Sequence, residues 1–197
     1  MPAALRQVTA ADIQPDAAFA AERKARRAAL LPLKKLRRVM LGPWATAYFE
    51  SFDTMLFQIQ EMLLIEKGGE AQLADELAAY NPLIPQGSEL VATVMFEIDD
   101  PVRRAAVLGS LGGVEDHFFL QGGSDRVAAR QEGDIERTRE DGKTSSVHFL
   151  RFEFTGDQVD AFKRPATTVM LGCDHPGYAH MALLSAETKA ELAKDFA

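Results

Sequence analysis

The sequence predicts an α+β fold in which an N-terminal helical layer packs on an antiparallel or mixed sheet. Apolar residues recur at spacings of three and four up to about residue 80, as in helices, and from Glu89 they alternate with a period of two, as in strands. The chain has 197 residues, 47% of them hydrophobic, which is enough for one core. We therefore expect a single domain, 1–197, with residues 1–88 mainly helical and residues 89–197 containing the sheet.

The first expected helix starts near residue 16 and is rich in Ala and Arg. Pro32 should break or kink it, because proline lacks the N–H that a helix interior needs. Leu33, Leu36 and Val39 give the basic segment that follows an apolar side. This segment should therefore dock onto the rest of the protein as an amphipathic arm.

A buried central helix is expected over residues 42–68. Pro43 suits the first helical position, Gly68 and Gly69 suit the end, and apolar residues occur on nearly every side between them. Within this apolar setting lie Glu50, Gln58, Glu61 and Glu66. Buried carboxylates must be paired, hydrogen-bonded or bound to a metal. The alternative is that these residues form a narrow stripe in contact with water.

The rest of the chain alternates short strands and helices. After a helix at 70–80, strands are expected near residues 89–98, 114–120, 125–131, 146–154, 167–172 and 181–184, with helices capped by Asp100, Thr155 and Ser185. Asp141-Gly142 is a hairpin signal for an edge strand. The order over residues 90–172 matches a ferredoxin-like sheet with an inserted hairpin, although other antiparallel or mixed sheets share it.

Basic residues gather at the start of the chain. Up to Met40 there are nine Lys and Arg against three Asp and Glu, a net charge of +6, which leaves −13 for the rest of a chain whose total is −7. Such a patch can bind phosphate or nucleic acid. An acidic body repels a polyanion, however, and no aromatic residues are interleaved for base stacking. We expect the basic arm to contact the protein's own acidic remainder or a second copy.

Two of the four histidines are candidate metal ligands. His148 lies among apolar residues in the strand expected at 146–154, and His175 lies in a turn near the C-terminus. Together with a carboxylate from Glu61, Glu97 or Asp174, they could hold iron or another divalent metal. The alternative is a satisfied core histidine and a turn whose side chains bond to the backbone.

Four further polar residues are candidates for ligand binding: Glu61, Arg151, Asp174 and Tyr178. Arg151 lies in the most apolar strand, and Asp174 and Tyr178 crowd a tight turn, so each needs partners that solvent does not supply there. We expect a pocket where the strand at 146–154 and the loop at 173–178 approach the central helix.

Cys173 is the single cysteine, which excludes an internal disulfide and fits a reducing compartment. A lone cysteine is more often a small buried hydrophobe than a reactive thiol. No apolar run approaches the ~18 residues of a membrane span, and the N-terminus lacks an apolar signal core. We expect a cytoplasmic protein.

Five runs stand out along the chain, in this order: RRVMLGP, YFESFDTMLFQIQEMLLIE, AYNPLIPQGSELVAT, SSVHFLRF and DHPGY. In these runs the chain resembles an uncharacterised bacterial protein family of unknown function, and the resemblance covers most of the chain. It implies no activity. Genes of that family often lie beside those for rubrerythrin and an iron–sulfur oxidoreductase, which implies a role near peroxide or redox metabolism.

Two hypotheses follow for the function. The first is a binding or accessory protein of a bacterial redox or oxidative-stress system, with a redox protein as partner and no chemistry of its own. The second is a metal-dependent oxidoreductase that uses His148, His175 and a Glu or Asp carboxylate, with a divalent metal such as iron as cofactor. The glycine-rich phosphate loop, Cys-x-x-Cys and His-Glu-x-x-His signatures of common enzymes are missing from the sequence. A homo-oligomer is compatible with both hypotheses.

Overall fold

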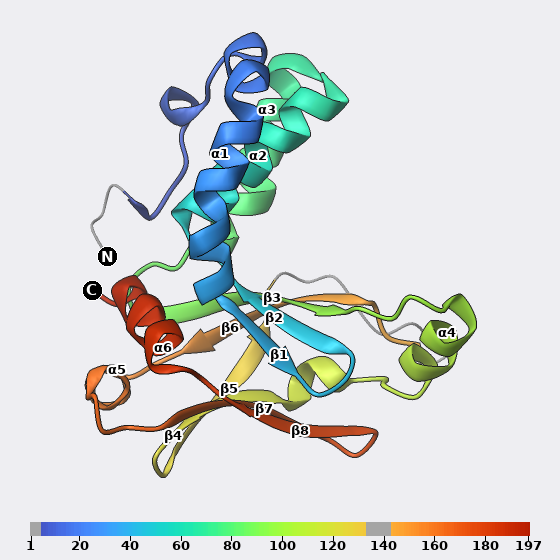
Figure 1. The fold of residues 1–197 in the computed structure, drawn as a ribbon, viewed down its shortest axis with the longest axis vertical. Coiled ribbons are helices and arrows are strands. Elements are labelled where there is room, and N and C mark those ends of the chain that lie inside the picture. Colours follow the sequence, from blue (N-terminus) through green and yellow to red (C-terminus); the bar gives the residue numbers. More distant parts are fainter. Residues whose placement is uncertain (1–4, 133–142) are drawn as a thin grey trace.

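The computed structural model describes residues 5–132 and 143–197. Figure 1 shows an arm of helices that projects from a strongly curved sheet. The arm consists of α1 (Asp16–Leu36), α2 (Phe52–Glu66) and α3 (Gly69–Tyr80), and shorter helices border the sheet: α4 (Pro101–Gly109), α5 (Gly156–Lys163) and α6 (Ala186–Leu192). Short 3-10 helices cover Ala10–Asp12 (η2), Asn81–Leu83 (η3), Val114–His117 (η4) and Ala193–Asp195 (η5).

The described strands form one eight-stranded sheet in the order β1-β2-β3-β6-β5-β4-β7-β8, and every neighbouring pair is antiparallel. The strands are β1 (Arg38–Leu41), β2 (Ala45–Phe49), β3 (Glu89–Phe96), β4 (Phe118–Gly122), β5 (Asp125–Gln131), β6 (Val147–Glu153), β7 (Val169–His175) and β8 (Tyr178–Leu183). The outer strands β1 and β8 approach each other (Figure 1), so the sheet is nearly closed and barrel-like.

This architecture corrects the expected fold class. The sheet is not a ferredoxin-like sheet covered by an N-terminal helical layer, because its described strands follow a different order and nearly close into a barrel, and the helical arm projects from it (Figure 1). In a ferredoxin-like sheet, each helix joins two parallel strands that have one strand between them. Here two strands lie between β3 and β4, which α4 connects, and two lie between β6 and β7, which α5 connects, so the connected strands run antiparallel. The sequence suggested otherwise because two of the eight strands lie in the part that was expected to be helical.

A hairpin of β1 and β2 replaces the first part of the expected central helix. The chain turns at Gly42, whose φ of +65° is left-handed, and Leu41 then pairs with Ala45. The helix itself, α2, begins after Ser51, whose side chain accepts a hydrogen bond from the backbone N–H of Thr54 at 3.4 Å. Strand β2 is covered on both faces, so its apolar residues do not show the alternation of a half-buried strand.

The helix α1 continues through Pro32 and ends at Leu36. We expected Pro32 to break or kink the helix, since it removes the hydrogen bond to the carbonyl of Ala28. Both residues are exposed, so water can take the place of that bond. The basic segment after Pro32 forms the end of α1 and then strand β1, in which Val39 and Leu41 are buried.

Several expected elements are confirmed. Asp100 caps α4 by accepting a hydrogen bond from Arg103 N at 2.6 Å, and Thr155 and Ser185 cap α5 and α6. The strand expected from residue 114 begins as η4 and becomes β4 only at Phe118. The hairpin expected at Asp141-Gly142 lies outside the described residues.

The sheet separates two apolar cores. Leu90, Ala92 and Val94 of β3 face the inner core, which fills the curved sheet. Val91 of the same strand faces the other way and joins Ile59 of α2 in a second core between the sheet and the arm. The period of two in β3 therefore supplies both cores.

Tyr178 joins the two ends of the sheet. Its hydroxyl accepts hydrogen bonds from the backbone N–H groups of Trp44 at 3.0 Å and Ala45 at 2.8 Å, and it donates one to Leu41 O at 2.5 Å. The side chain is 2% exposed, and its ring stacks on that of Trp44 with centroids 5.8 Å apart. A side chain of β8 thus satisfies the backbone at the turn between β1 and β2.

We expect Tyr178→Phe to lower the free energy of unfolding by ~1–3 kcal/mol, because buried backbone groups lose their partner. Urea denaturation followed by circular dichroism would measure the loss. Tyr48→Phe is the matched control, since the Tyr48 hydroxyl donates to Glu97 at the surface, and it should stay within about 0.5 kcal/mol of the parent. Equal losses in both variants would contradict a role for Tyr178 in closing the sheet.

Candidate functional site

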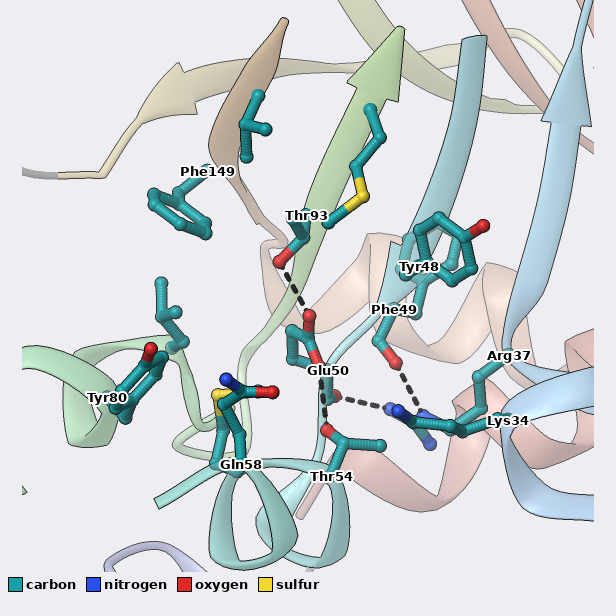
Figure 2. A pocket seen from close by; sticks show the side chains of 14 residues that line it. Lys34, Arg37, Tyr48, Phe49, Glu50, Thr54, Gln58, Tyr80, Thr93 and Phe149 are labelled. Atoms are coloured by element: carbon teal, nitrogen blue, oxygen red, sulfur yellow. Dashed lines mark hydrogen bonds between the residues drawn. The ribbon is translucent and has the colours of Figure 1, made fainter. Parts of the chain in front are cut away.

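A cavity of about 280 Å³ lies where the base of the helical arm meets the outer face of the sheet (Figure 2). Its walls are mostly apolar and come from neighbouring strands and the facing helices: Tyr48, Met95, Val147 and Phe149 from the sheet, and Met55, Tyr80 and Leu83 from α2, α3 and η3. The polar groups at the cavity include Glu50, Thr54, Gln58 and Thr93, with Lys34 and Arg37 from the end of α1. Apolar walls with a few converging polar groups are typical of small-molecule sites.

The Glu50 carboxyl lies at this cavity and is held from both sides. The residue directly follows β2 and precedes the Ser51 cap of α2, so the strand and the helix start fix its backbone. Thr93 Oγ1 of β3 donates to Glu50 Oε1 at 2.5 Å, and Thr54 Oγ1 of α2 donates to Oε2 at 2.7 Å (Figure 2). Glu50 is only 8% exposed.

Opposing effects act on the pKa of Glu50. Burial raises the pKa of Glu50, and this effect exceeds the opposing effect of its hydrogen bonds from Thr93 and Thr54. The Thr54 hydroxyl also lies 3.0 Å from Ser51 O, a carbonyl oxygen that already accepts a hydrogen bond from the backbone N–H of Met55 at 3.0 Å. The Thr54 hydroxyl proton is therefore available to Glu50 Oε2, and each oxygen of the carboxyl accepts a hydrogen bond from a hydroxyl group.

Arg37 borders the cavity but is engaged by the protein itself. Its Nε donates to Phe49 O at 3.0 Å and its Nη2 to Glu50 O at 2.7 Å (Figure 2). Nη2 also pairs with Asp195, and Nη1 lies 3.5 Å from Glu191 Oε1. Burial raises the pKa of Asp195, and the neighbouring Glu191 acts in the same direction.

The predicted site residues Glu61 and Arg151 have partners away from this cavity. Arg23 of α1 binds Glu61 through two hydrogen bonds of 2.7 and 2.6 Å, which lower the pKa of Glu61. Arg151 of β6 donates to Glu89 at 2.8 Å and to Glu132 at 2.6 Å. Both ion-pair sets join neighbouring elements of the fold.

His148 lies on the inner face of β6 and is 0% exposed, whereas its neighbours in the strand line the cavity on the outer face. Its Nε2 lies 2.9 Å from Ser145 O and 3.3 Å from Thr144 Oγ1, and its Nδ1 lies 3.9 Å from Glu115 Oε2. The ring packs edge-on against Phe96 with centroids 6.0 Å apart. The sheet therefore separates His148 from the cavity.

Asp174 and His175 lie at the end of β7, near the surface. Asp174 accepts a hydrogen bond from Arg126 at 2.6 Å and lies 2.9 Å from His117 Nδ1, and these two groups, Arg126 first, lower its pKa. The His175 ring packs edge-on against that of His117 with centroids 5.0 Å apart. The contacts of His175 are thus different from those of His148.

Across residues 5–132 and 143–197, no group of three or more His, Cys, Asp or Glu side chains is placed to hold a metal ion.

Cys173 behaves as the small buried hydrophobe that the sequence favoured. It is 2% exposed, and burial raises its pKa to about 11, so the thiolate form is scarce at neutral pH.

In the described part of the chain, no helix combines the length and the apolar character that crossing a membrane requires.

Some residues of the cavity were notable in the sequence, but the sequence alone did not place them side by side. Glu50 and Gln58 were polar residues of the central helix, and Lys34 belonged to the basic cluster, while Thr93 and Met95 were not singled out. Strand β3 carried a usable signal, because it is apolar on both faces and must therefore be covered on both. What was missing was the assignment of β2, which places Glu50 beside β3.

Comparisons with known proteins agree with the family resemblance. The chain matches, over residues 7–196, the model of a family described as protein of unknown function (DUF3501). A crystal structure of a novel protein of unknown function from Burkholderia pseudomallei is 36% identical with a TM-score of 0.89, covering 97% of this chain and 100% of that chain. A search of curated proteins finds no match. The chain belongs to the DUF3501 family.

Proposed function

We propose that the protein binds a small molecule in the cavity between the helical arm and the sheet. Its volume of about 280 Å³ is close to the lower end of ligand cavities, ~300 Å³, so a compact ligand is expected. The apolar walls would take the body of the ligand. The few polar groups would fix its orientation.

The observation that carries the proposal is the buried carboxyl of Glu50 at the cavity. Burying a carboxyl costs free energy, and an apolar side chain of similar size at this position would avoid that cost. A titratable group whose pKa is shifted by burial and which faces a cavity is typical of functional sites. Thr93 and Thr54 orient this group from two different elements.

Binding without chemistry is the class of the first hypothesis from the sequence, and the cavity supports that class. The redox or oxidative-stress setting and a redox protein partner stay predictions from the family resemblance. The metal-dependent oxidoreductase with His148 and His175 stays a prediction too. Metal analysis of protein purified without an affinity tag tests it.

Methionine methyl groups offer a direct test of binding. Met55 and Met95 line the cavity, whereas Met40 and Met181 are exposed elsewhere, by 64% and 54%. In protein labelled at the methionine methyl carbons, we expect a compact aromatic probe such as benzoate or benzamide to shift the Met55 and Met95 resonances saturably. The Met40 and Met181 resonances should stay in place, because those residues lie outside the cavity.

A variant that fills the cavity supplies the control. Met95→Trp should abolish the response of Met55, because the larger ring occupies the space of the probe. Met181→Trp places the same ring on the exposed strand β8 and should leave the response unchanged. Failure of all probes to shift Met55 and Met95, or the same response in both variants, would refute binding at this cavity.

A further inference from the structure

We infer, building on the ligand-binding function proposed above, that the cavity takes a small monocarboxylate with an apolar body, whose carboxylate lies against the amino group of Lys34. Two basic side chains and one acidic side chain line the cavity: Lys34, Arg37 and Glu50. Their different states decide which ligand charge the cavity accepts.

Arg37 does not offer its charge to a ligand. The side chain is 2% exposed, and its N–H groups bind Phe49 O, Glu50 O and Asp195, with Glu191 nearby. The two carboxyl groups on the far side of Arg37 offset its positive charge. Arg37 therefore shapes the wall of the cavity without supplying a free cation.

Glu50 does not supply an anion in its protonated form. The Thr93 and Thr54 hydroxyl groups occupy both oxygens of the carboxyl, and burial raises its pKa, which disfavours the charged form. A neutral Glu50 presents a polar surface to the ligand without repelling a carboxylate. An ionised Glu50 would repel it.

Lys34 supplies the positive charge that remains. Its side chain lies beside Arg37 and extends toward the side of the cavity where Glu50 lies (Figure 2). Among residues 5–132 and 143–197, Lys34 has no carboxylate within ion-pair distance, and Glu61 on the facing helix is already bound by Arg23. The nearest described aromatic contact of its Nζ is the Phe57 ring, with a distance of 6.0 Å to the centroid.

One free ammonium beside apolar walls favours a singly charged anion. A cationic ligand would meet the like charges of Lys34 and Arg37, and burial disfavours the ionised form of Glu50 that would attract it. A phosphate monoester carries about −1.5 to −2 charges at neutral pH and is best held by arginine forks, but Arg37 is engaged. A monocarboxylate needs a single counter-charge, and its apolar body fits the walls.

Four probes with the same ring separate these classes. Benzoate, benzamide and benzamidine are close in shape and differ in charge, and phenyl phosphate adds a larger anion. Titrations would follow the Met55 and Met95 methyl resonances at constant ionic strength. We expect benzoate to bind more tightly than each of the other three by about tenfold, the effect of one good charge-assisted hydrogen bond.

Neighbouring lysines supply the matched variants. Lys34→Gln should weaken benzoate binding by about tenfold and leave benzamide binding unchanged, because only the anion needs the ammonium group. Lys35→Gln removes the same charge at the next position of α1, which does not line the cavity, and should leave both unchanged. An equal loss of benzoate binding in the two variants would overturn the placement at Lys34.

The pH dependence gives an independent readout. Charged groups that face Glu50 are Lys34 and Arg37, and uncharged neighbours at the cavity are Thr54 and Gln58 of α2, Thr93 of β3, Tyr48 of β2 and Tyr80 of α3. Benzoate affinity should fall as the pH rises through the raised pKa of Glu50, because the carboxyl then becomes an anion beside the ligand. Glu50→Gln should bind benzoate without this fall.

The outcomes distinguish the ligand class from the binding function. A preference for benzamide, benzamidine or phenyl phosphate, with shifts at Met55 and Met95, would overturn the monocarboxylate and leave small-molecule binding in place. Absence of shifts at these methyl groups with all four probes would overturn both. Benzoate binding that Lys34→Gln leaves intact would also overturn the monocarboxylate site.

Discussion

Replacing Arg37 with methionine is expected to lower the free energy of unfolding by ~3–5 kcal/mol, the range for removing one partner of a buried ion pair. Asp195, which is 3% exposed, would lose its counter-ion, and the carbonyl oxygens of Phe49 and Glu50 would lose their donors. Methionine keeps much of the apolar volume, so the loss reports on charge and hydrogen bonds. Urea denaturation followed by circular dichroism measures it.

The next residue of the chain supplies the control for this substitution. The Arg38 side chain is 45% exposed, and its ion pair with Glu97, at 3.6 Å, lies at the surface. Exposed ion pairs contribute little to stability, so Arg38→Met should stay within about 0.5 kcal/mol of the parent. Adding Asp195→Asn to Arg37→Met should recover part of the stability, because the uncompensated charge is removed.

The loss caused by Arg37→Met should also depend on pH. Burial already raises the pKa of Asp195, and Arg37 holds that pKa down. Without Arg37 the pKa of Asp195 in the folded protein rises further. A carboxyl with a raised pKa in the folded state destabilises the protein as the pH rises through that pKa, because the buried group must then ionise. The deficit should therefore be larger at pH 7 than near pH 4, where Asp195 also takes up a proton in the unfolded chain. An equal deficit at both pH values would assign the cost to packing instead.

Ile59→Ala should lower the free energy of unfolding by ~2–5 kcal/mol, the range for truncating a buried aliphatic side chain. Ile59 of α2 is 0% exposed and lies in the second core with Met55, Leu63 and Val91. Denaturant midpoints of the parent and the variant would give the difference.

A second isoleucine on the same helix is the matched control. Ile65 is 61% exposed near the end of α2, so Ile65→Ala should stay within about 0.5 kcal/mol of the parent. Leu56 of the same helix is only half-buried, and its truncation should cost less than that of Ile59. Comparable effects of Ile59→Ala and Ile65→Ala would mean that α2 is peripheral.

The sequence by itself determined most of the local elements and the family. Asp100, Thr155 and Ser185 announced helix starts because a capping side chain bonds to backbone only a few residues away. The period of two in the residues of β3 and β6 predicted strands, because successive side chains of a strand point to opposite faces. The pattern of β6 also correctly predicted that His148 lies among apolar residues, but it did not identify the groups that contact His148.

Only the tertiary structure decided that residues 38–49 form a hairpin. A segment that is covered on both faces is apolar throughout, so its pattern fits a buried helix as well as a strand. The hydrogen-bond partners of β2 on its second side lie in β3, where Ala45 pairs with Phe96. The closure of the sheet by Tyr178 depends on a similar meeting of segments far apart in the chain.

The same reason governs the cavity. In sequence, Glu50 is one of several polar residues in an apolar run, and Lys34 is one of several basic residues. Their roles follow from the packing of the arm on the sheet, which brings Thr93 to Glu50 and commits Arg37 to Asp195. Burial and the loss of water set the state of a carboxyl, and these are properties of the assembled fold rather than of a local run of residues.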